Sequence, residues 1–184
     1  MSARFHQQLL AAYVAPSAGG GGGVTWTGVL NATHSAGTIS KTLGSWNPAY
    51  GNSVETISSG GTGYFEFDSI GLPESRVFLW LGPASGSPYT SRGSSPGIYI
   101  VLQDAYIEFR DVTDFSYQGN VSYTPGSDVV RFGFDGSNHM RVWLNGTPVF
   151  TDDESVTTED QILFVEFSGD GSAGIGIENV IIGS

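Results

Sequence analysis

Short stretches in which apolar and polar side chains alternate constrain the fold of this chain more than any other feature. In GYFEFD, Phe65 and Phe67 alternate with Tyr64, Glu66 and Asp68, so an extended strand here would have one apolar face and one polar face. VVRFGFDG alternates in the same way. Turn-forming residues separate such stretches about every eight to twelve residues, a spacing typical of a β-sandwich or jelly roll.

The composition agrees with many strands joined by tight turns. The chain has 27 glycines, 12% aromatic residues and only 14% charged residues. Its 184 residues suffice for one domain with a sizeable core and are few for two. We therefore predict one all-β domain, an antiparallel β-sandwich, over residues 24–184. The clearest predicted strands are VTWTGVL, GYFEFDSI, RVFLWLG, GIYIVLQ, AYIEFRDV, VVRFGFDG, the two halves of MRVWLNGTPVF, QILFVEF and IGIENVII.

The segment MRVWLNGTPVF is predicted to form a β-hairpin. Asn145 and Gly146 are the two residue types that tolerate positive φ in a type I′ turn. Alternation places the apolar side chains of the first strand in the core and leaves Arg141 and Trp143 on the opposite face. Trp143 is therefore expected to point outward.

The N-terminus differs in character from the domain. We predict an anchoring arm over residues 1–16, followed by a Gly-rich tether over residues 17–23. Four apolar residues of the arm recur at helical spacing and would share one face: Phe5, Leu9, Ala12 and Tyr13. An isolated helix of about a dozen residues is marginal in water, so we expect it to be ordered only when docked. A cleaved secretory signal peptide is the alternative interpretation of this segment.

The charge balance excludes several classes of partner. Lys and Arg total 7 against 18 Asp and Glu, which gives a net charge of −11. No nucleic acid is expected as a partner, because binding to phosphates requires a basic patch. No membrane insertion is expected either, because every apolar run is shorter than the roughly 18 residues that a spanning helix needs. The absence of cysteine excludes disulfides and thiol chemistry.

Several of these segments together resemble a known superfamily. VTWTGVLNATHSAGTISKT, GYFEFD, RVWLNGTPVF and GIGIENVII are similar, in their order, to the concanavalin A-like lectins and glucanases. The resemblance is strongest to the small jelly-roll domains of bacterial surface proteins and of phage tail, fibre or spike proteins. It implies two antiparallel sheets packed face to face, one of them concave.

The resemblance also implies what a catalytic member would need. Superfamily members that hydrolyse β-glucans carry E-x-D-x-E on one strand, where the outer glutamates act as nucleophile and general acid. Glu66 and Asp68 match the first half of this motif, but Ser69, Ile70 and Gly71 follow where the second glutamate should stand. We therefore expect no enzyme activity, and a glycoside hydrolase is the least favoured alternative.

Aromatic residues beside amides indicate where a sugar could bind. GSWNPAYGNS, from Gly44 to Ser53, is predicted to be a recognition loop, and a second long loop runs from Gly82 to Gly97. The predicted carbohydrate-binding residues are Trp46, Asn47, Tyr50, Asn52, Tyr89, Arg92 and Trp143. Rings of this kind stack on sugars, but they equally suit subunit contacts or the core.

No metal site or cofactor is predicted. The three histidines are scattered, without cysteine partners. Lectins of this superfamily often bind calcium, and carboxylates gather at residues 151–154 and 159–160. Their spacing matches no calcium-loop signature, so a solvated acidic loop is the better interpretation.

These features lead to a hypothesis about function. The favoured interpretation is a non-enzymatic, virion-associated structural protein, such as a phage capsid decoration, head fibre or tail fibre. Its arm would attach to other virion proteins, and its lectin-like domain would be displayed towards host-surface glycans. A homo-oligomer is expected, with a trimer as the favoured state. The alternative is a free carbohydrate-binding module, which would be extracellular or secreted.

Overall fold

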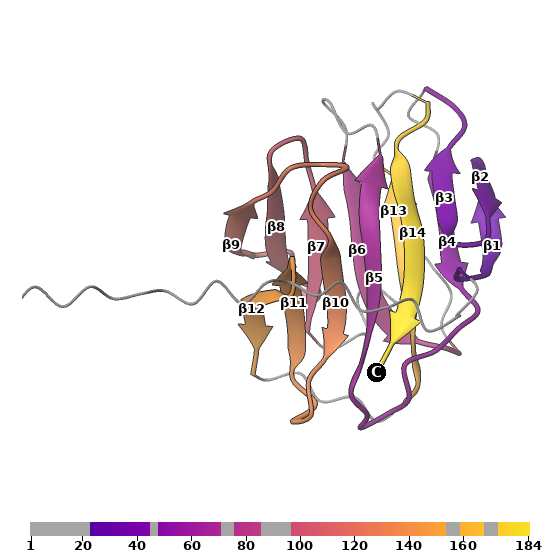
Figure 1. Cartoon of the computed structure of the whole chain (residues 1–184). Helices are drawn as coiled ribbons and strands as arrows, with labels where there is room; N and C mark the ends of the chain where they lie inside the picture. Colours follow the sequence, from indigo (N-terminus) through magenta and orange to yellow (C-terminus); the bar gives the residue numbers. More distant parts are fainter. Residues whose placement is uncertain (1–22, 45–47, 71–75, 86–96, 154–158, 168–172) are drawn as a thin grey trace, which may run out of the picture.

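The computed structural model describes residues 23–44, 48–70, 76–85, 97–153, 159–167 and 173–184, which form strands and no helix (Figure 1). The predicted arm, with Phe5, Leu9, Ala12 and Tyr13, lies outside the described residues. The strands are β1 (Trp26–Leu30), β2 (Ala32–Ser35), β3 (Thr38–Lys41), β4 (Ala49–Ser53), β5 (Gly63–Ile70), β6 (Val77–Pro83), β7 (Ile98–Leu102), β8 (Tyr106–Asp111), β9 (Tyr117–Ser122), β10 (Val130–Phe134), β11 (Met140–Leu144), β12 (Thr147–Asp152), β13 (Gln161–Phe167) and β14 (Gly176–Gly183).

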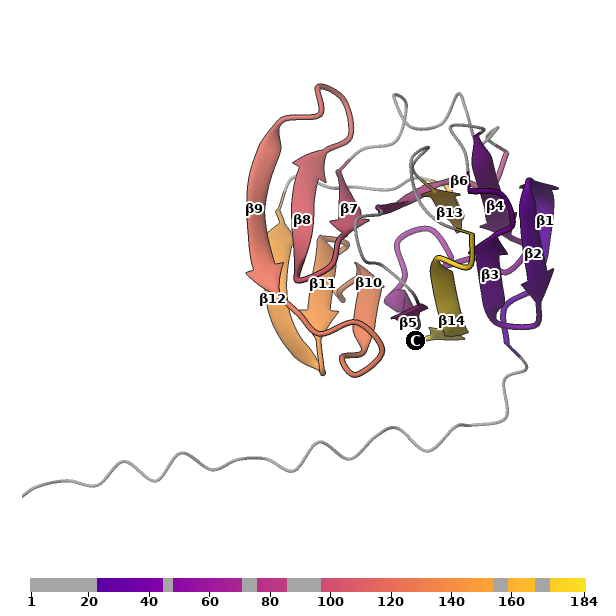
Figure 2. The ribbon, with the colours of Figure 1, turned by 90° about the horizontal axis from the view of Figure 1, so that it is seen from above.

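The strands form two antiparallel sheets that pack face to face, which Figure 2 shows from above. Sheet A has the order β1-β4-β13-β6-β7-β8-β9, and sheet B has the order β12-β11-β10-β5-β14-β3-β2. Neighbours in each sheet are often distant in the sequence, as in a jelly roll. The predicted all-β antiparallel sandwich is confirmed.

The core lies between the two sheets and follows the alternation of the sequence. Phe65 and Phe67 of β5 are fully buried, and Phe132 of β10 pairs with Phe65 in the register of sheet B. The hairpin prediction is also confirmed, because β11 and β12 pair and the residues between them, Asn145 and Gly146, both have positive φ. Alternation therefore predicted which side chains enter the core.

Four strands were not among the predicted ones, namely β2, β3, β4 and β9. The predicted recognition loop is wrong in its second half, because β4 pairs with β1 on one side and with β13 on the other. Gly51 sits at an inward position of β4, where a Cβ would lie 2.5 Å from Ile39 Cδ1. The neighbouring core side chain fills that space, so β4 lacks the apolar alternation that marks the other strands.

The described chain begins beside sheet B. The Val24 amide donates to the carbonyl of Val180 on β14 at 3.0 Å, and the Gly37 amide donates to the Val24 carbonyl at 2.8 Å. Among the described residues, the structure has no helix with the length and apolar character needed to cross a membrane.

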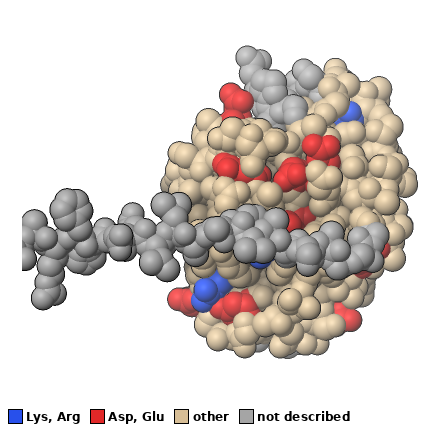
Figure 3. Space-filling model, in the orientation of Figure 1, with Lys and Arg blue, Asp and Glu red and all other residues tan. Residues whose placement is uncertain are grey.

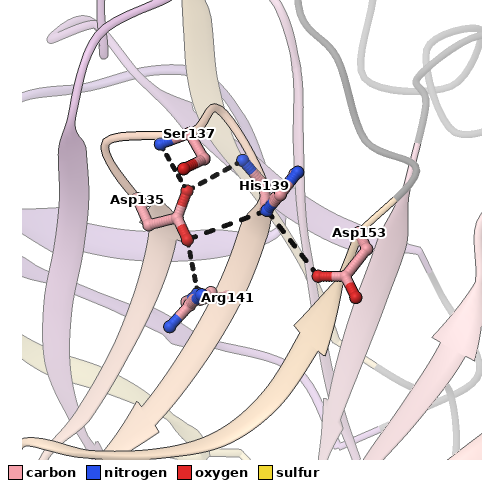
Figure 4. A network of polar contacts seen from close by, with 5 residues as sticks. All are labelled: Asp135, Ser137, His139, Arg141 and Asp153. Carbon is pink, nitrogen blue, oxygen red and sulfur yellow. Dashed lines mark hydrogen bonds and ion pairs between the residues drawn. The ribbon is translucent and has the colours of Figure 1, made fainter.

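The turn between β10 and β11 is held by one carboxylate, Asp135 (Figure 4). Its Oδ1 accepts hydrogen bonds from the amides of Ser137 at 2.8 Å and His139 at 3.1 Å, and its Oδ2 lies 2.6 Å from Arg141 Nε. His139 Nδ1 also lies 3.6 Å from Asp153 Oδ1, next to the end of β12. Burial alone would raise the pKa of Asp135, but these amides and the charges of Arg141 and His139 outweigh it, so the pKa lies below its ordinary value.

The substitution Asp135→Asn is expected to lower the free energy of unfolding by about 1 kcal/mol at neutral pH, because charge-assisted hydrogen bonds become neutral ones. A carboxyl group whose folded pKa is depressed stabilises the fold above its unfolded pKa and loses this contribution as the pH falls through the folded value. The difference in free energy of unfolding between wild type and Asp135→Asn should therefore vanish in acid. Urea unfolding of both proteins across the acid range measures this difference. A difference that grows as the pH falls would contradict the stabilising role of the ionised Asp135 carboxylate.

Candidate functional site

The outer face of sheet A carries two rows of side chains that run across its strands. Strand register places the members of each row side by side. The first row is Asn52, Phe164, Trp80, Tyr99, Arg110 and Tyr117. The second row is Tyr50, Glu166, Phe78, Val101, Glu108 and Asn120. Aromatic and hydrogen-bonding side chains thus face away from the core along the whole sheet.

The middle of this face is packed rather than open. Trp80 and Phe164 are 1% and 0% exposed, and their rings stack with centroids 5.4 Å apart and an interplanar angle of 11°. With Tyr99, Val101 and other apolar neighbours they form a hydrophobic cluster separate from the core between the sheets. These aromatic residues therefore stabilise the domain and do not present a surface to a ligand.

The end of the face at β8 and β9, which lie on the left in Figure 2, carries exposed side chains. We call the five residues there the corner platform: Glu108, Arg110, Phe115, Tyr117 and Asn120. Phe115 is 44% exposed and Tyr117 is 54% exposed, which is unusual for rings of this size. The Phe115 ring packs edge-on against the buried Tyr99, with centroids 5.9 Å apart and an angle of 67° between the planes.

Phe115 is held in a costly backbone conformation. Its φ is 62°, in the left-handed region that bulky residues rarely adopt. Arg110 Nη1 donates to the Phe115 carbonyl at 3.2 Å, and the Asp111 amide donates to the carbonyl of Ser116 at 3.0 Å. Strain at a bulky, exposed residue persists only where the surroundings impose it, and such positions gather at functional sites.

Asp111 organises the turn that carries Phe115. Its Oδ1 accepts hydrogen bonds from the hydroxyl and the amide of Thr113 and from the amide of Asp114. The hydrogen bond from the Thr113 side chain, with those from the two amides, holds the pKa of Asp111 below its ordinary value. The turn is therefore ordered before any ligand arrives, and the Phe115 ring is presented in one orientation.

The polar groups of the corner platform are also fixed in place. Arg110 Nε donates to Glu108 Oε2 at 2.9 Å, and Arg110 Nη2 lies 2.8 Å from the same oxygen. This hydrogen bond to Glu108 raises the pKa of Arg110 above its ordinary value. Asn120 Nδ2 donates to Tyr117 Oη at 2.6 Å and so holds the second exposed ring. Two flat rings with amide, hydroxyl and charged groups beside them can stack on a sugar and bond its hydroxyls.

The predicted sugar-binding residues do not form a single site in the part of the chain that the structure describes. Tyr50 and Asn52 lie on the outer face of sheet A, on β4, at the far side of the buried aromatic cluster from the corner platform. Trp143 lies on the outer face of sheet B, with its ring 6.4 Å from that of Tyr64. Because the two faces point in opposite directions, Trp143 and Tyr50 cannot bind one ligand together. The other predicted residues, Trp46, Asn47, Tyr89 and Arg92, lie outside the described residues.

The carboxylates of the partial E-x-D motif also point outward, from the face of sheet B on which acidic side chains gather (Figure 3). Glu66 pairs with Arg131, whose guanidinium carbon lies 4.5 Å from the centre of the Tyr64 ring. Asp68 Oδ2 accepts a hydrogen bond from Asn179 Nδ2 at 2.9 Å. Both carboxylates thus have a role in sheet B as cross-strand partners.

Within the described ranges, no group of three or more His, Asp or Glu side chains is placed to hold a metal ion. The predicted acidic loop is described only at residues 151–153 and 159–160. Asp160 Oδ1 accepts a hydrogen bond from the Ser59 amide at 2.9 Å, so this carboxylate fastens one loop to another.

Phe115 and Tyr117 were not among the predicted sugar-binding residues. The signal available was DFSY, two rings spaced two residues apart in an otherwise polar segment. Apolar rings in a polar turn are unusual, because turns are rich in small and polar residues. That contrast marks a surface candidate, although it cannot show the backbone conformation of Phe115.

Comparisons with known proteins agree on the fold. No protein-family model and no curated protein matches the sequence. The carbohydrate recognition domain of Emp46p in its potassium-bound form is similar with a TM-score of 0.61 and 13% identity, over 85% of this chain and 87% of that one. A legume lectin-like domain from Entamoeba histolytica has a TM-score of 0.56 and 10% identity, over 88% of this chain and 90% of that one.

An alginate lyase of polysaccharide lyase family 7 is also similar, with a TM-score of 0.54 and 15% identity, over 80% of this chain and 78% of that one. The sequence identities are low in every case, so the likeness concerns the backbone arrangement alone. The chain has the concanavalin A-like jelly-roll fold that lectins and some carbohydrate-active enzymes share.

Proposed function

We propose that this protein is a non-catalytic carbohydrate-binding module and that it contacts sugar through the corner platform. The observation that carries the proposal is the presentation of Phe115 and Tyr117: two exposed rings, one on a strained turn and one fixed by Asn120. Similarity in fold to carbohydrate recognition domains supports it.

The physical basis is the match between a ring and a sugar face. Pyranose rings expose C–H groups on one face and hydroxyls around the rim, so an aromatic ring can cover the apolar face while neighbouring polar groups bond the rim. Because the rings of the platform are already ordered, binding would cost little side-chain entropy. Each ring would then contribute roughly 1 to 1.5 kcal/mol, which is about a tenfold change in affinity.

The test is binding to a panel of polysaccharides by wild type and by two platform variants, Phe115→Gly and Tyr117→Ala. Each variant is expected to weaken binding about tenfold. Glycine at position 115 accepts the positive φ without strain, so the free energy of unfolding should change by less than about 1 kcal/mol despite the loss of the ring. Loss of binding could then not be attributed to unfolding. Isothermal calorimetry and affinity electrophoresis measure the two affinities.

Trp143→Ala is the matched control, because it removes an outward ring from the opposite face of the sandwich. It should leave polysaccharide binding unchanged. If Trp143→Ala abolished binding while Phe115→Gly preserved it, the proposed site would be on the wrong sheet. If no polysaccharide bound to the wild type, the proposed function itself would be contradicted.

A second candidate is a carbohydrate-active enzyme, favoured by the similarity in fold to an alginate lyase. The carboxylates of the partial E-x-D motif are engaged by Arg131 and Asn179, so we do not favour it. Incubation with laminarin, lichenan and alginate, followed by reducing-end and unsaturated-product assays, tests it. Product formation by the wild type would establish this candidate instead.

We further propose that the module is displayed on a virion, of the fibre, spike or decoration type, as a homo-oligomer held through residues 1–16. The amphipathic sequence of the arm and its Gly-rich tether support this part of the proposal. Light scattering on the full chain, beside a variant lacking residues 1–23, tests it. Oligomers that dissociate on truncation are expected, and monomers in both cases would contradict it.

A further inference from the structure

The charges around the corner platform restrict which sugars it can accept. Within the described part of this corner, the carboxylate of Glu108 lies against the guanidinium of Arg110, and two further carboxylates, Asp111 and Asp114, lie in the turn that carries Phe115. The whole chain carries a net charge of −11. A polyanionic chain approaching this surface would therefore be repelled both at long range and on contact.

The guanidinium of Arg110 already pairs with groups of the protein itself. Its Nε and Nη2 face Glu108 Oε2, and its Nη1 donates to the Phe115 carbonyl. The fork geometry with which arginine binds a carboxylate or a sulfate is thus already occupied. Glu108 is only 13% exposed, so its charge lies beside the guanidinium and not in bulk water.

The hydrogen-bonding group against the Tyr117 ring is uncharged. Asn120 is exposed, and its amide joins the Tyr117 hydroxyl at 2.6 Å. Hydroxyl and amide groups of this kind pair well with sugar hydroxyls, and they carry no charge that would favour an acidic sugar.

We infer that the corner platform binds uncharged polysaccharides and rejects uronate or sulfated ones, and that Glu108 is the residue that sets this specificity. The inference rests on the proposed function. Glu108 occupies the Arg110 fork and places a negative charge next to the rings, so the guanidinium of the described corner platform is not available to an anionic sugar.

The experiment compares laminarin and lichenan, which are neutral, with alginate and hyaluronate, which are anionic, at low and high ionic strength. Wild type should bind a neutral polysaccharide with an affinity that changes less than about twofold with salt, because no charged pair forms on binding. Glu108→Gln should raise alginate or hyaluronate binding at low salt by about tenfold relative to neutral binding by the same variant, because Arg110 is released. Phe115→Gly should weaken both kinds of binding about tenfold.

Glu66→Gln is the matched control. It makes the same change of charge and breaks the equivalent glutamate–arginine pair, that of Glu66 and Arg131, on the opposite sheet. Glu66→Gln should not increase the binding of anionic polysaccharides to the corner platform. If wild type bound alginate or hyaluronate through the platform more tightly than a neutral polysaccharide, or if Glu108→Gln changed nothing, the inference would be overturned while the proposed function stood. If no binding depended on Phe115, the proposed function would fail and this inference with it.

Discussion

Valine at position 133 is expected to prevent this protein from folding. Gly133 lies in β10, which pairs with both β5 and β11 in sheet B. A Cβ at this position would lie 2.0 Å from the carbonyl oxygen of Gly63 and 2.5 Å from the Tyr64 Cα. Both are backbone atoms held by the sheet, so the strands would have to separate. We expect a loss of more than about 4 kcal/mol, close to the whole stability of many domains.

Soluble expression, circular dichroism and thermal unfolding measure the effect of Gly133→Val. The control is Gly136→Ala in the turn that follows β10, where a Cβ would meet only Thr62 Cγ2 at an ordinary 3.5 Å. Its free energy of unfolding should stay within about 0.5 kcal/mol of wild type. A Gly133→Val protein that unfolds at the wild-type temperature would show that β10 and β5 are not paired in this register.

Truncation of Trp80 is expected to have the second largest effect. Although Trp80 faces away from the core between the sheets, it is 1% exposed and stacks on Phe164. Trp80→Ala should lower the free energy of unfolding by about 3 to 5 kcal/mol, because a large cavity opens in the outer cluster of sheet A. Denaturant unfolding measures this loss, and a change below about 1 kcal/mol would mean that the cluster is not packed as described.

The Trp80→Ala variant also distinguishes residues that stabilise the outer face of sheet A from residues that bind ligand there. Trp80 and the corner platform lie on the same outer face of sheet A, yet the first is buried and the second is exposed. Folded Trp80→Ala protein at low temperature should bind polysaccharide like the wild type, whereas Phe115→Gly should be stable and should bind about tenfold more weakly. The reverse pattern would place the ligand over the middle of the sheet.

The fold could be predicted from the sequence wherever one face of a strand is buried. GYFEFD and VVRFGFDG alternate because their inward residues enter the core, and Asn145-Gly146 closes a hairpin because both residues accept positive φ. Strands β4 and β9 escaped prediction, since AYGNS and YQGNVS are rich in Gly and polar residues and are held by their neighbours. Tertiary pairing, and not local pattern, makes these segments strands.

The candidate site could be predicted from the sequence less well than the fold, for a physical reason. Alternation separates the two faces of one strand but does not say to which sheet that strand belongs, so Tyr50 and Trp143 could not be assigned to opposite faces of the sandwich. Nor does the sequence show that Trp80 is buried, because its neighbours on β13 and β7 are far away in the chain. Phe115 became a candidate only through its φ and its exposure.

The central claim is that sugar binds at the corner of sheet A formed by β8 and β9. The most direct measurement is the mapping of amide chemical-shift changes in labelled protein during titration with a soluble laminarin oligosaccharide. The account predicts that the changes concentrate between Glu108 and Asn120 and spare sheet B. Changes centred on Glu66, Arg131 and Trp143 would contradict it and would place the binding site on the opposite face.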